Sequence, residues 1–183
     1  MKKLLTSLFL SVILITNAQA EKIKTEVNAT AFDKAVVAHV IGQSIQRFPL
    51  AEDVTFEDAI DSMKLRASMI GFKEVADLPL SEEVKAKLSV MGKDNSKVRK
   101  MRILAFCDAM IAAEMVDYNI IFAGFLPCRI AAVEDENKKG WLVTMNMDMM
   151  LHAVDLPPHL TELAKKVRDN IYDIVEAGVN GEL

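Results

Sequence analysis

Two short apolar segments, residues 129–134 and 141–147, flank a polar stretch that runs from Asp135 to Gly140. Both segments have strand length and contain β-branched or aromatic residues, and the stretch between them has the composition of a turn. This pattern predicts a β-hairpin, because strands joined by a short turn pair antiparallel. An isolated hairpin is only marginally stable in water, so other elements of the chain must cover one of its faces.

Most of the remaining chain repeats its apolar residues at helical spacing. Residue types that favour helix starts precede these repeats: Thr30, Thr55, Ser81, Asp108, and Pro157 or Pro158. The first predicted helix runs through Ile45 and is closed by Pro49, and the last ends at Gly178. One further strand is predicted over residues 101–106. The sequence therefore predicts an α+β fold, with helices packed on a small, mostly antiparallel sheet in a single domain.

Residues 1–20 have the pattern of a secretory signal peptide. Lys2 and Lys3 precede an apolar run over residues 4–15, and residues 18–20 (Ala-Gln-Ala) give the small-x-small cleavage motif. A run of about 12 residues is shorter than the roughly 20 that a membrane-spanning helix needs. We therefore expect cleavage before Glu21 and release into the periplasm or the medium, with no membrane attachment afterwards. An uncleaved anchor is the alternative.

Cleavage would leave residues 21–54 as an N-terminal helical extension and residues 55–178 as the α+β domain. Loss of the two signal lysines from 22 basic residues leaves 20, against 26 acidic residues, so the mature chain is net acidic. Nucleic-acid binding needs a basic surface that neutralises phosphates. The charge therefore argues against a nucleic-acid partner.

Cys107 and Cys128 are the two cysteines of the chain, and export would place them where disulfides persist. Cys107 lies between a predicted strand and a predicted helix, whose N-terminus lowers a thiol pKa, whereas the neighbouring Asp108 opposes this effect. The two sulfurs can meet if their strands are antiparallel neighbours, and a parallel crossover would separate them. A structural disulfide, two buried thiols and a redox-active or metal-binding pair all remain open. No Cys-x-x-Cys motif and no histidine placed as a base mark a catalytic nucleophile.

Methionines are concentrated before the last predicted helix, at positions 145, 147, 149 and 150. Thioethers are soft ligands for Cu(I), and an envelope copper site can be drawn from these side chains, a nearby histidine and the cysteines. The metal candidates are Cys107, Cys128, Met147 and His152. The alternative is core packing, because Met145 and Met147 share one face of the predicted strand and methionine fills irregular gaps well.

Arg129 follows Cys128 inside an apolar strand. A buried arginine needs a carboxylate or a ligand anion, and Asp108 or Asp148 could supply the carboxylate. Arg129 and Asp108 therefore join Cys107 and Cys128 as candidates for ligand binding. A separate basic stretch is either a solvated loop or a docking site for an acidic partner: Lys93, Lys97, Arg99, Lys100 and Arg102.

Three segments resemble a known family: Arg-Ile-Leu-Ala-Phe-Cys-Asp at residues 102–108, Leu-Pro-Cys-Arg-Ile at 126–130 and Val-Glu-Asp at 133–135. Together with residues 145–151 and the last predicted helix, they are similar to the family catalogued as domain of unknown function 302. The resemblance covers residues 55–177. It implies a compact α/β domain that can dimerise, and it implies no reaction.

The leading hypothesis is an exported, non-enzymatic module of the cell envelope that binds a small ligand or a partner protein. Its site would lie around Cys107, residues 126–129 and residues 145–151, and no cofactor is expected. The alternative is a redox-active or Cu(I)-handling protein that uses Cys107 and Cys128. A small enzyme ranks third, because no catalytic constellation is visible and we assign no catalytic residue. A homodimer is left open.

Overall fold

The computed structural model describes residues 34–92 and 98–182, so the predicted signal peptide at residues 1–20 lies outside the described residues. The predicted helix start at Thr30 lies outside them as well. One compact unit spans residues 42–183, and most of helix α2 (Lys34–Gln43) belongs to the unit before it. No helix of the described chain is both long enough and apolar enough to cross a membrane.

The described strands form one antiparallel sheet in the order β1-β5-β4-β3-β2. They are β1 (Ile45–Pro49), β2 (Lys73–Leu78), β3 (Val98–Cys107), β4 (Cys128–Asp135) and β5 (Gly140–Met145). β4 and β5 form the predicted hairpin, and β3 pairs with β4 so that Phe106 lies opposite Cys128. The predicted α+β fold with a mostly antiparallel sheet is confirmed.

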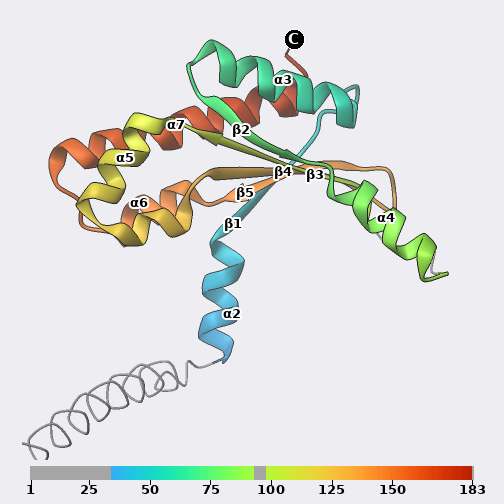
Figure 1. Cartoon of the computed structure of the whole chain (residues 1–183), viewed down its shortest axis with the longest axis horizontal. Helices are drawn as coiled ribbons and strands as arrows, with labels where there is room; N and C mark the ends of the chain where they lie inside the picture. The colour runs from blue at the N-terminus through green and yellow to red at the C-terminus, as the bar shows by residue number, and fades with distance from the viewer. Residues whose placement is uncertain (1–33, 93–97, 183) are drawn as a thin grey trace, which may run out of the picture. The chain divides into compact units, whose positions relative to one another are not determined.

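Two helices, α3 (Phe56–Met69) and α7 (Pro158–Asn180), lie side by side over one face of the sheet (Figure 1). Apolar side chains from both helices and the sheet are buried between the layers: Ile60, Met63, Leu104, Phe106, Ile130, Leu142, Ile171 and Ile174. The sequence predicts that the last helix ends at Gly178, but this helix continues to Asn180. Gly178 lies inside α7 where the two helices approach closely, and Gly181, with φ of 65°, ends the helix.

Local sequence signals set the starts of two helices as predicted. Thr55 begins α3 with a capping box, in which its hydroxyl accepts a hydrogen bond from the Asp58 amide at 3.1 Å and the Asp58 carboxylate accepts one from the Thr55 amide at 3.2 Å. Asp108 begins α5 (Ala109–Tyr118) by accepting a hydrogen bond from the Ile111 amide at 3.2 Å. The third predicted helix is α4 (Leu80–Val90), which contacts β3.

Four short elements are missing from the sequence prediction. The first predicted helix runs through Ile45, whereas α2 stops at Gln43 and β1 begins at Ile45. β2 lies in a stretch for which no element is predicted. Both are edge strands, and each has alternating exposed positions that weaken the apolar signal. The 3₁₀ helix η1 (Ile120–Phe125) and helix α6 (Met147–Ala153) are the other two. The predicted strand over residues 141–147 is therefore too long, because β5 ends at Met145 and Met147 begins α6.

Candidate functional site

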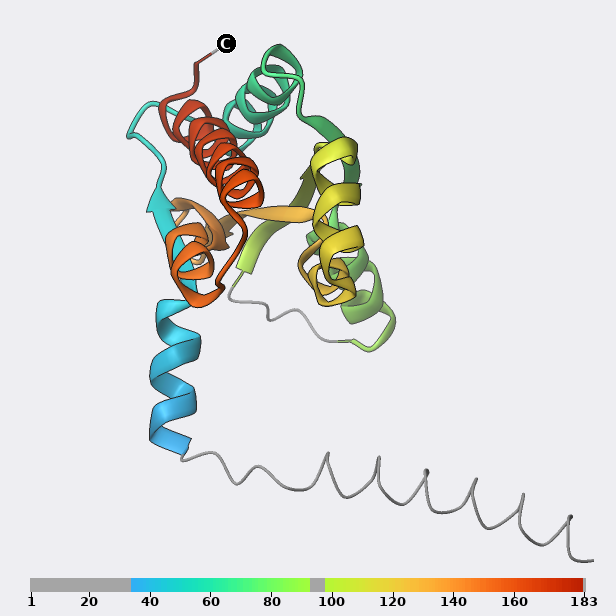
Figure 2. The same ribbon diagram turned by 90° about the vertical axis from the view of Figure 1, so that its left-hand side faces the viewer.

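The two cysteines lie at the same end of the sheet. β3 ends at Cys107, and the chain passes through α5 and η1 before β4 begins at Cys128. Because β3 and β4 are antiparallel neighbours, the end of one strand lies beside the start of the other. The antiparallel arrangement that the sequence left open is therefore the one present. Figure 2 looks onto this end of the sheet, with α5 in yellow on one side and α6 in orange on the other.

A cavity of about 100 Å³ lies between these elements. Its walls come from the ends of β3, β4 and β5 and from α5, η1, α6 and α7. Three phenylalanines line it, namely Phe72, Phe122 and Phe125, together with aliphatic side chains from the surrounding helices. Asp108 is the one ionisable group besides the cysteines among the lining residues. The cavity is therefore almost wholly apolar.

Sulfur is concentrated in the lining of this cavity. Six of its eighteen lining residues carry sulfur, whereas the whole chain of 183 residues has eleven methionines and two cysteines. The six are Cys107, Met115, Cys128, Met145, Met147 and Met150. Methionine side chains are flexible and polarisable, and they make favourable contacts with aromatic rings. The lining can therefore adapt to the shape of an apolar guest.

Both cysteines are free thiols, and burial holds them in the protonated form. Burial raises the pKa of Cys107, and the negative charge of Asp108 raises it further. Burial also raises the pKa of Cys128 to about 11, with a smaller contribution from Cys107 and an opposing one from Arg129. The thiolate is the form that attacks electrophiles and binds metals, so neither sulfur is activated at neutral pH.

The structure brings together most, but not all, of the predicted metal ligands. Cys107, Cys128 and Met147 line one cavity, whereas His152 is exposed at the end of α6 and does not line it. Within the described ranges, no group of three or more His, Cys, Asp or Glu side chains could hold a metal ion. The sulfur atoms are thus the only predicted ligands that the described cavity gathers.

Arg129 is exposed, which corrects the expectation of a buried arginine. Cys128 and Ile130 face the core, and the alternation of a strand turns Arg129 to the opposite face of the sheet. The two carboxylates expected to pair with it have other partners. Asp148 binds Arg168 at 3.2 Å, and Asp108, which caps α5, lies 4.0 Å from Lys166.

The predicted basic stretch is largely neutralised within its own domain. Arg99 pairs with Glu134 at 2.8 Å and Lys100 pairs with Glu57 at 2.7 Å. Arg102 makes a two-point contact with Asp77, one of whose bonds measures 2.7 Å. Lys93 and Lys97 lie outside the described residues. A second hollow of about 240 Å³ is lined by as many carboxylates as cations, so an acidic partner gains little there: Glu57, Asp61 and Glu82 with Lys85, Lys100 and Arg102.

Sequence reasoning missed α6, which forms a wall of the cavity. Asn146 begins this helix, because its side-chain oxygen accepts a hydrogen bond from the Met149 amide at 3.0 Å. The lining residues of this segment are Met147, Met150, Leu151 and Val154. Their spacing of three, one and three residues is the spacing of one helical face. That spacing indicates a helix, but Met145 and Met147 also fit the alternation of a strand, which the sequence analysis favours.

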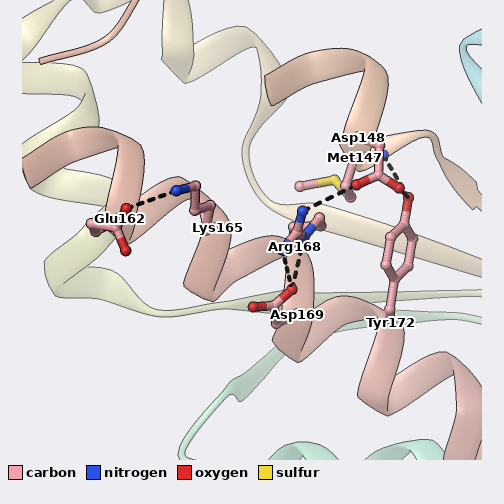
Figure 3. A network of polar contacts seen from close by, with 7 residues as sticks. All are labelled: Met147, Asp148, Glu162, Lys165, Arg168, Asp169 and Tyr172. Atoms are coloured by element: carbon pink, nitrogen blue, oxygen red, sulfur yellow. Dashed lines mark hydrogen bonds and ion pairs between the residues drawn. The ribbon is translucent and has the colours of Figure 1, made fainter. Parts of the chain in front are cut away.

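Polar contacts join the first turn of α6 to α7 (Figure 3). The Asp148 carboxylate accepts a hydrogen bond from Arg168 at 3.2 Å and one from the Tyr172 hydroxyl at 3.3 Å. The Tyr172 oxygen in turn accepts a hydrogen bond from the Met147 amide at 3.1 Å. Burial raises the pKa of Tyr172, so its hydroxyl is protonated at neutral pH and can donate to Asp148.

With this geometry in place, the comparisons with known proteins identify the family. The family model described as "Domain of unknown function DUF302" matches residues 48–178. The chain belongs to the DUF302 family. The resemblance based on residues 102–108, 126–130 and 133–135 is thereby confirmed. The matched range begins within β1, whereas the sequence prediction starts the domain at residue 55.

A solved structure supports the DUF302 fold. It is titled "Crystal structure of uncharacterized conserved protein DUF302 from Bacillus stearothermophilus" and is 20% identical to this chain, with a TM-score of 0.56. The match covers 73% of this chain and 96% of the other. The comparison with curated proteins gives no match. At this identity the likeness concerns the fold alone, so the function must be argued from the cavity.

Proposed function

We propose that this DUF302 protein is an exported, non-enzymatic accessory module of the cell envelope that binds a small apolar molecule in the sulfur-lined cavity. The observation that carries the proposal is the cavity itself, a preformed apolar space walled by residues from several elements. The envelope location rests on the signal-peptide pattern of residues 1–20. An envelope protein partner and a homodimer stay predictions.

The volume of the cavity sets the size of the ligand. An engineered apolar cavity of about 150 Å³ in another protein stays dry and binds benzene or xenon. With a volume of about 100 Å³, this cavity suits a molecule no larger than a single ring or a short branched chain. A larger hydrophobic molecule, such as a long acyl chain, would need the walls to move.

The lining also sets the polarity of the ligand. Asp108 is the sole lining carboxylate, and one of its oxygens already accepts hydrogen bonds from two α5 amides. An anion would lose its hydration and meet the like charge of Asp108, and a cation would compete with Lys166, which lies 4.0 Å from the other Asp108 oxygen. We therefore assign an uncharged, polarisable ligand. Binding rather than catalysis is proposed because Cys107 and Cys128, the nucleophilic side chains of the lining, are held as thiols.

Two neighbouring alanines on α5 allow a matched test. Ala112 lines the cavity, whereas Ala113 is exposed on the same helix. We expect fluorobenzene to bind the wild-type protein, and Ala112→Leu to weaken this binding by at least about tenfold, or ~1.4 kcal/mol, because leucine fills the space. Ala113→Leu has the same helix propensity and should leave binding unchanged. ¹⁹F NMR of fluorobenzene measures the affinity.

Absence of binding to the wild-type protein would contradict the proposal. Equal weakening by Ala112→Leu and Ala113→Leu would contradict it too, because the probe would then occupy a different place.

A redox-active or Cu(I)-handling role is the second candidate, and the shared cavity of Cys107, Cys128 and Met147 favours it. Cu(I) binding must displace both thiol protons, so its affinity should rise with pH up to the pKa of Cys128, about 11. Anaerobic Cu(I) titration at pH 6 and pH 8, compared with Cys128→Ala, measures this dependence. A Cu(I) affinity that changes neither with pH nor with Cys128→Ala would show that Cu(I) binds outside the cavity. His152→Ala should have no effect, since His152 does not line the cavity.

A further inference from the structure

Helix α6 forms one wall of the cavity, and its neighbour in the domain is α7. It has seven residues, Met147 to Ala153, and it places Met147, Met150 and Leu151 on the cavity wall. A helix this short is not stable alone, because its few hydrogen bonds do not offset the loss of backbone entropy. Contacts with neighbouring elements must therefore hold it in place.

One carboxylate of α6 makes polar side-chain contacts with α7, and Met147 adds apolar packing against the core. Asp148 Oδ1 accepts from Arg168 Nη1 at 3.2 Å, and Oδ2 accepts from the Tyr172 hydroxyl at 3.3 Å (Figure 3). Arg168 and Tyr172 lie one helical turn apart on α7, so both side chains reach the same partner. The bond from the Met147 amide to the Tyr172 oxygen, at 3.1 Å, completes the attachment.

We propose that Asp148 is a positioning residue that holds α6 against α7 and thereby controls how fast a ligand leaves the cavity. The inference rests on the proposed function, because it assigns the wall through which the bound molecule exchanges. When Asp148 separates from Arg168 and Tyr172, the wall carrying Met147, Met150 and Leu151 can move outward, and a bound ligand then leaves faster.

The burial of these groups suits a contact that opens and closes. The Asp148 side chain is 48% exposed and the Arg168 side chain 29% exposed. Ion pairs at such positions are partly screened by water and contribute little to stability. The core residues of α7, Ile171 and Ile174, are in contrast fully buried. Local opening of α6 can therefore occur without unfolding the domain.

The point before α6 stays fixed when this contact opens. The Asn146 amide donates to the Ser44 carbonyl at 2.8 Å, and its side chain donates to the Gln43 carbonyl at 3.0 Å. Neither bond involves α7. Asn146 therefore anchors the start of the segment, and the displacement of α6 is a local movement about this point.

The test compares Asp148→Asn with Glu162→Gln. Glu162 pairs with Lys165 at 2.8 Å on the exposed side of α7, so its substitution removes the same charge without touching α6 (Figure 3). ¹⁹F exchange NMR with fluorobenzene gives the dissociation rate, and hydrogen exchange gives the opening of residues 147–153. We expect Asp148→Asn to raise both rates by up to about fivefold, the range for an exposed ion pair. Glu162→Gln should change neither, and Asp148→Glu, which keeps the charge, should restore most of the wild-type rate.

The two proposals can fail separately. If fluorobenzene does not bind the wild-type protein, the proposed function fails, and the hydrogen-exchange comparison still decides whether Asp148 holds α6. If fluorobenzene binds and Asp148→Asn behaves like Glu162→Gln, the positioning role is overturned. A rise in hydrogen exchange across α3 and α7 as well as α6 would also overturn it, because Asp148 would then support the whole fold.

Discussion

The position of a single side chain can be predicted from the sequence only where it depends on nearby residues. Thr55 and Asp108 could be assigned as helix caps from the sequence, because a cap depends on residues within three positions. Arg129 could not be placed, because residues 129–134 are apolar enough for either strand face to be the buried one. Its orientation is set by the register with β3, which puts Cys128 opposite the buried Phe106.

Cys128 should make the stability of the domain sensitive to alkaline pH. Its pKa is about 11 in the folded protein against 9.0 ordinarily, so folding favours the neutral thiol. This contribution is complete below about pH 9 and is lost as the pH rises towards 11, a total of up to ~2–3 kcal/mol. Urea unfolding between pH 8 and pH 11 measures the loss, and Cys128→Ala should flatten it.

Cys107→Ala is the control for this prediction. Cys107 is less buried than Cys128, so its removal should leave most of the pH dependence in place. If the free energy of unfolding of Cys128→Ala still falls with pH as steeply as in the wild-type protein, another group is responsible for the loss.

The sequence predicts the helices and strands whose apolar residues repeat with one clear period. The hairpin of β4 and β5 and the long helix α7 have a clear apolar face, and both are present. Helix α6 was read as the end of a strand, because Met145 and Met147 are two residues apart. The predicted ligand site, around Cys107, residues 126–129 and residues 145–151, overlaps the lining of the cavity. The shape of the cavity could not be predicted, since it depends on how α5, η1 and α6 meet at the end of the sheet.

The contact between α3 and α7 depends on the missing side chain of Gly178. An added Cβ would lie 2.6 Å from Met63 Cγ and 2.8 Å from Leu142 Cδ1, and 3.1 Å from a backbone oxygen of α3. Helix propensity alone would favour Gly178→Ala by up to about 1 kcal/mol. We expect a destabilisation of about 1–3 kcal/mol instead, because the overpacking is the larger effect. Chemical denaturation measures it.

Gly124→Ala is the matched control, because an added Cβ there meets nothing within 4 Å. Its effect should stay within about 0.5 kcal/mol. A stabilised Gly178→Ala variant would mean that Met63 and Leu142 move aside easily.

One edge of the sheet is formed by β1, which lies before the predicted start of the domain at residue 55. β1 pairs with β5 from Ile45 opposite Met145 to Pro49 opposite Trp141. Phe48 packs against the core and lies 6.4 Å from the ring of Tyr172. β1 was read as part of a helical extension, since its partner lies far away in the sequence and local patterns do not reveal such pairing.

This boundary can be tested by shortening the chain. A protein that begins at Gly42 should fold with the stability of the full-length chain. One that begins at Thr55 loses β1 and Phe48, and we expect its free energy of unfolding to fall by about 2 kcal/mol or more. Urea denaturation followed by circular dichroism compares the two. Equal stabilities would place β1 outside the cooperative unit.

The position of β1 in the sheet has a consequence for the order of folding. Ile45 and Met145 are neighbours in the sheet but a hundred residues apart in the chain. Contacts of this range form late, because a long loop must close before they are gained. As the chain emerges N-terminus first, from a ribosome or a translocation pore, β1 has no partner until β5 has followed it. The sheet is therefore completed last at the edge that was synthesised first.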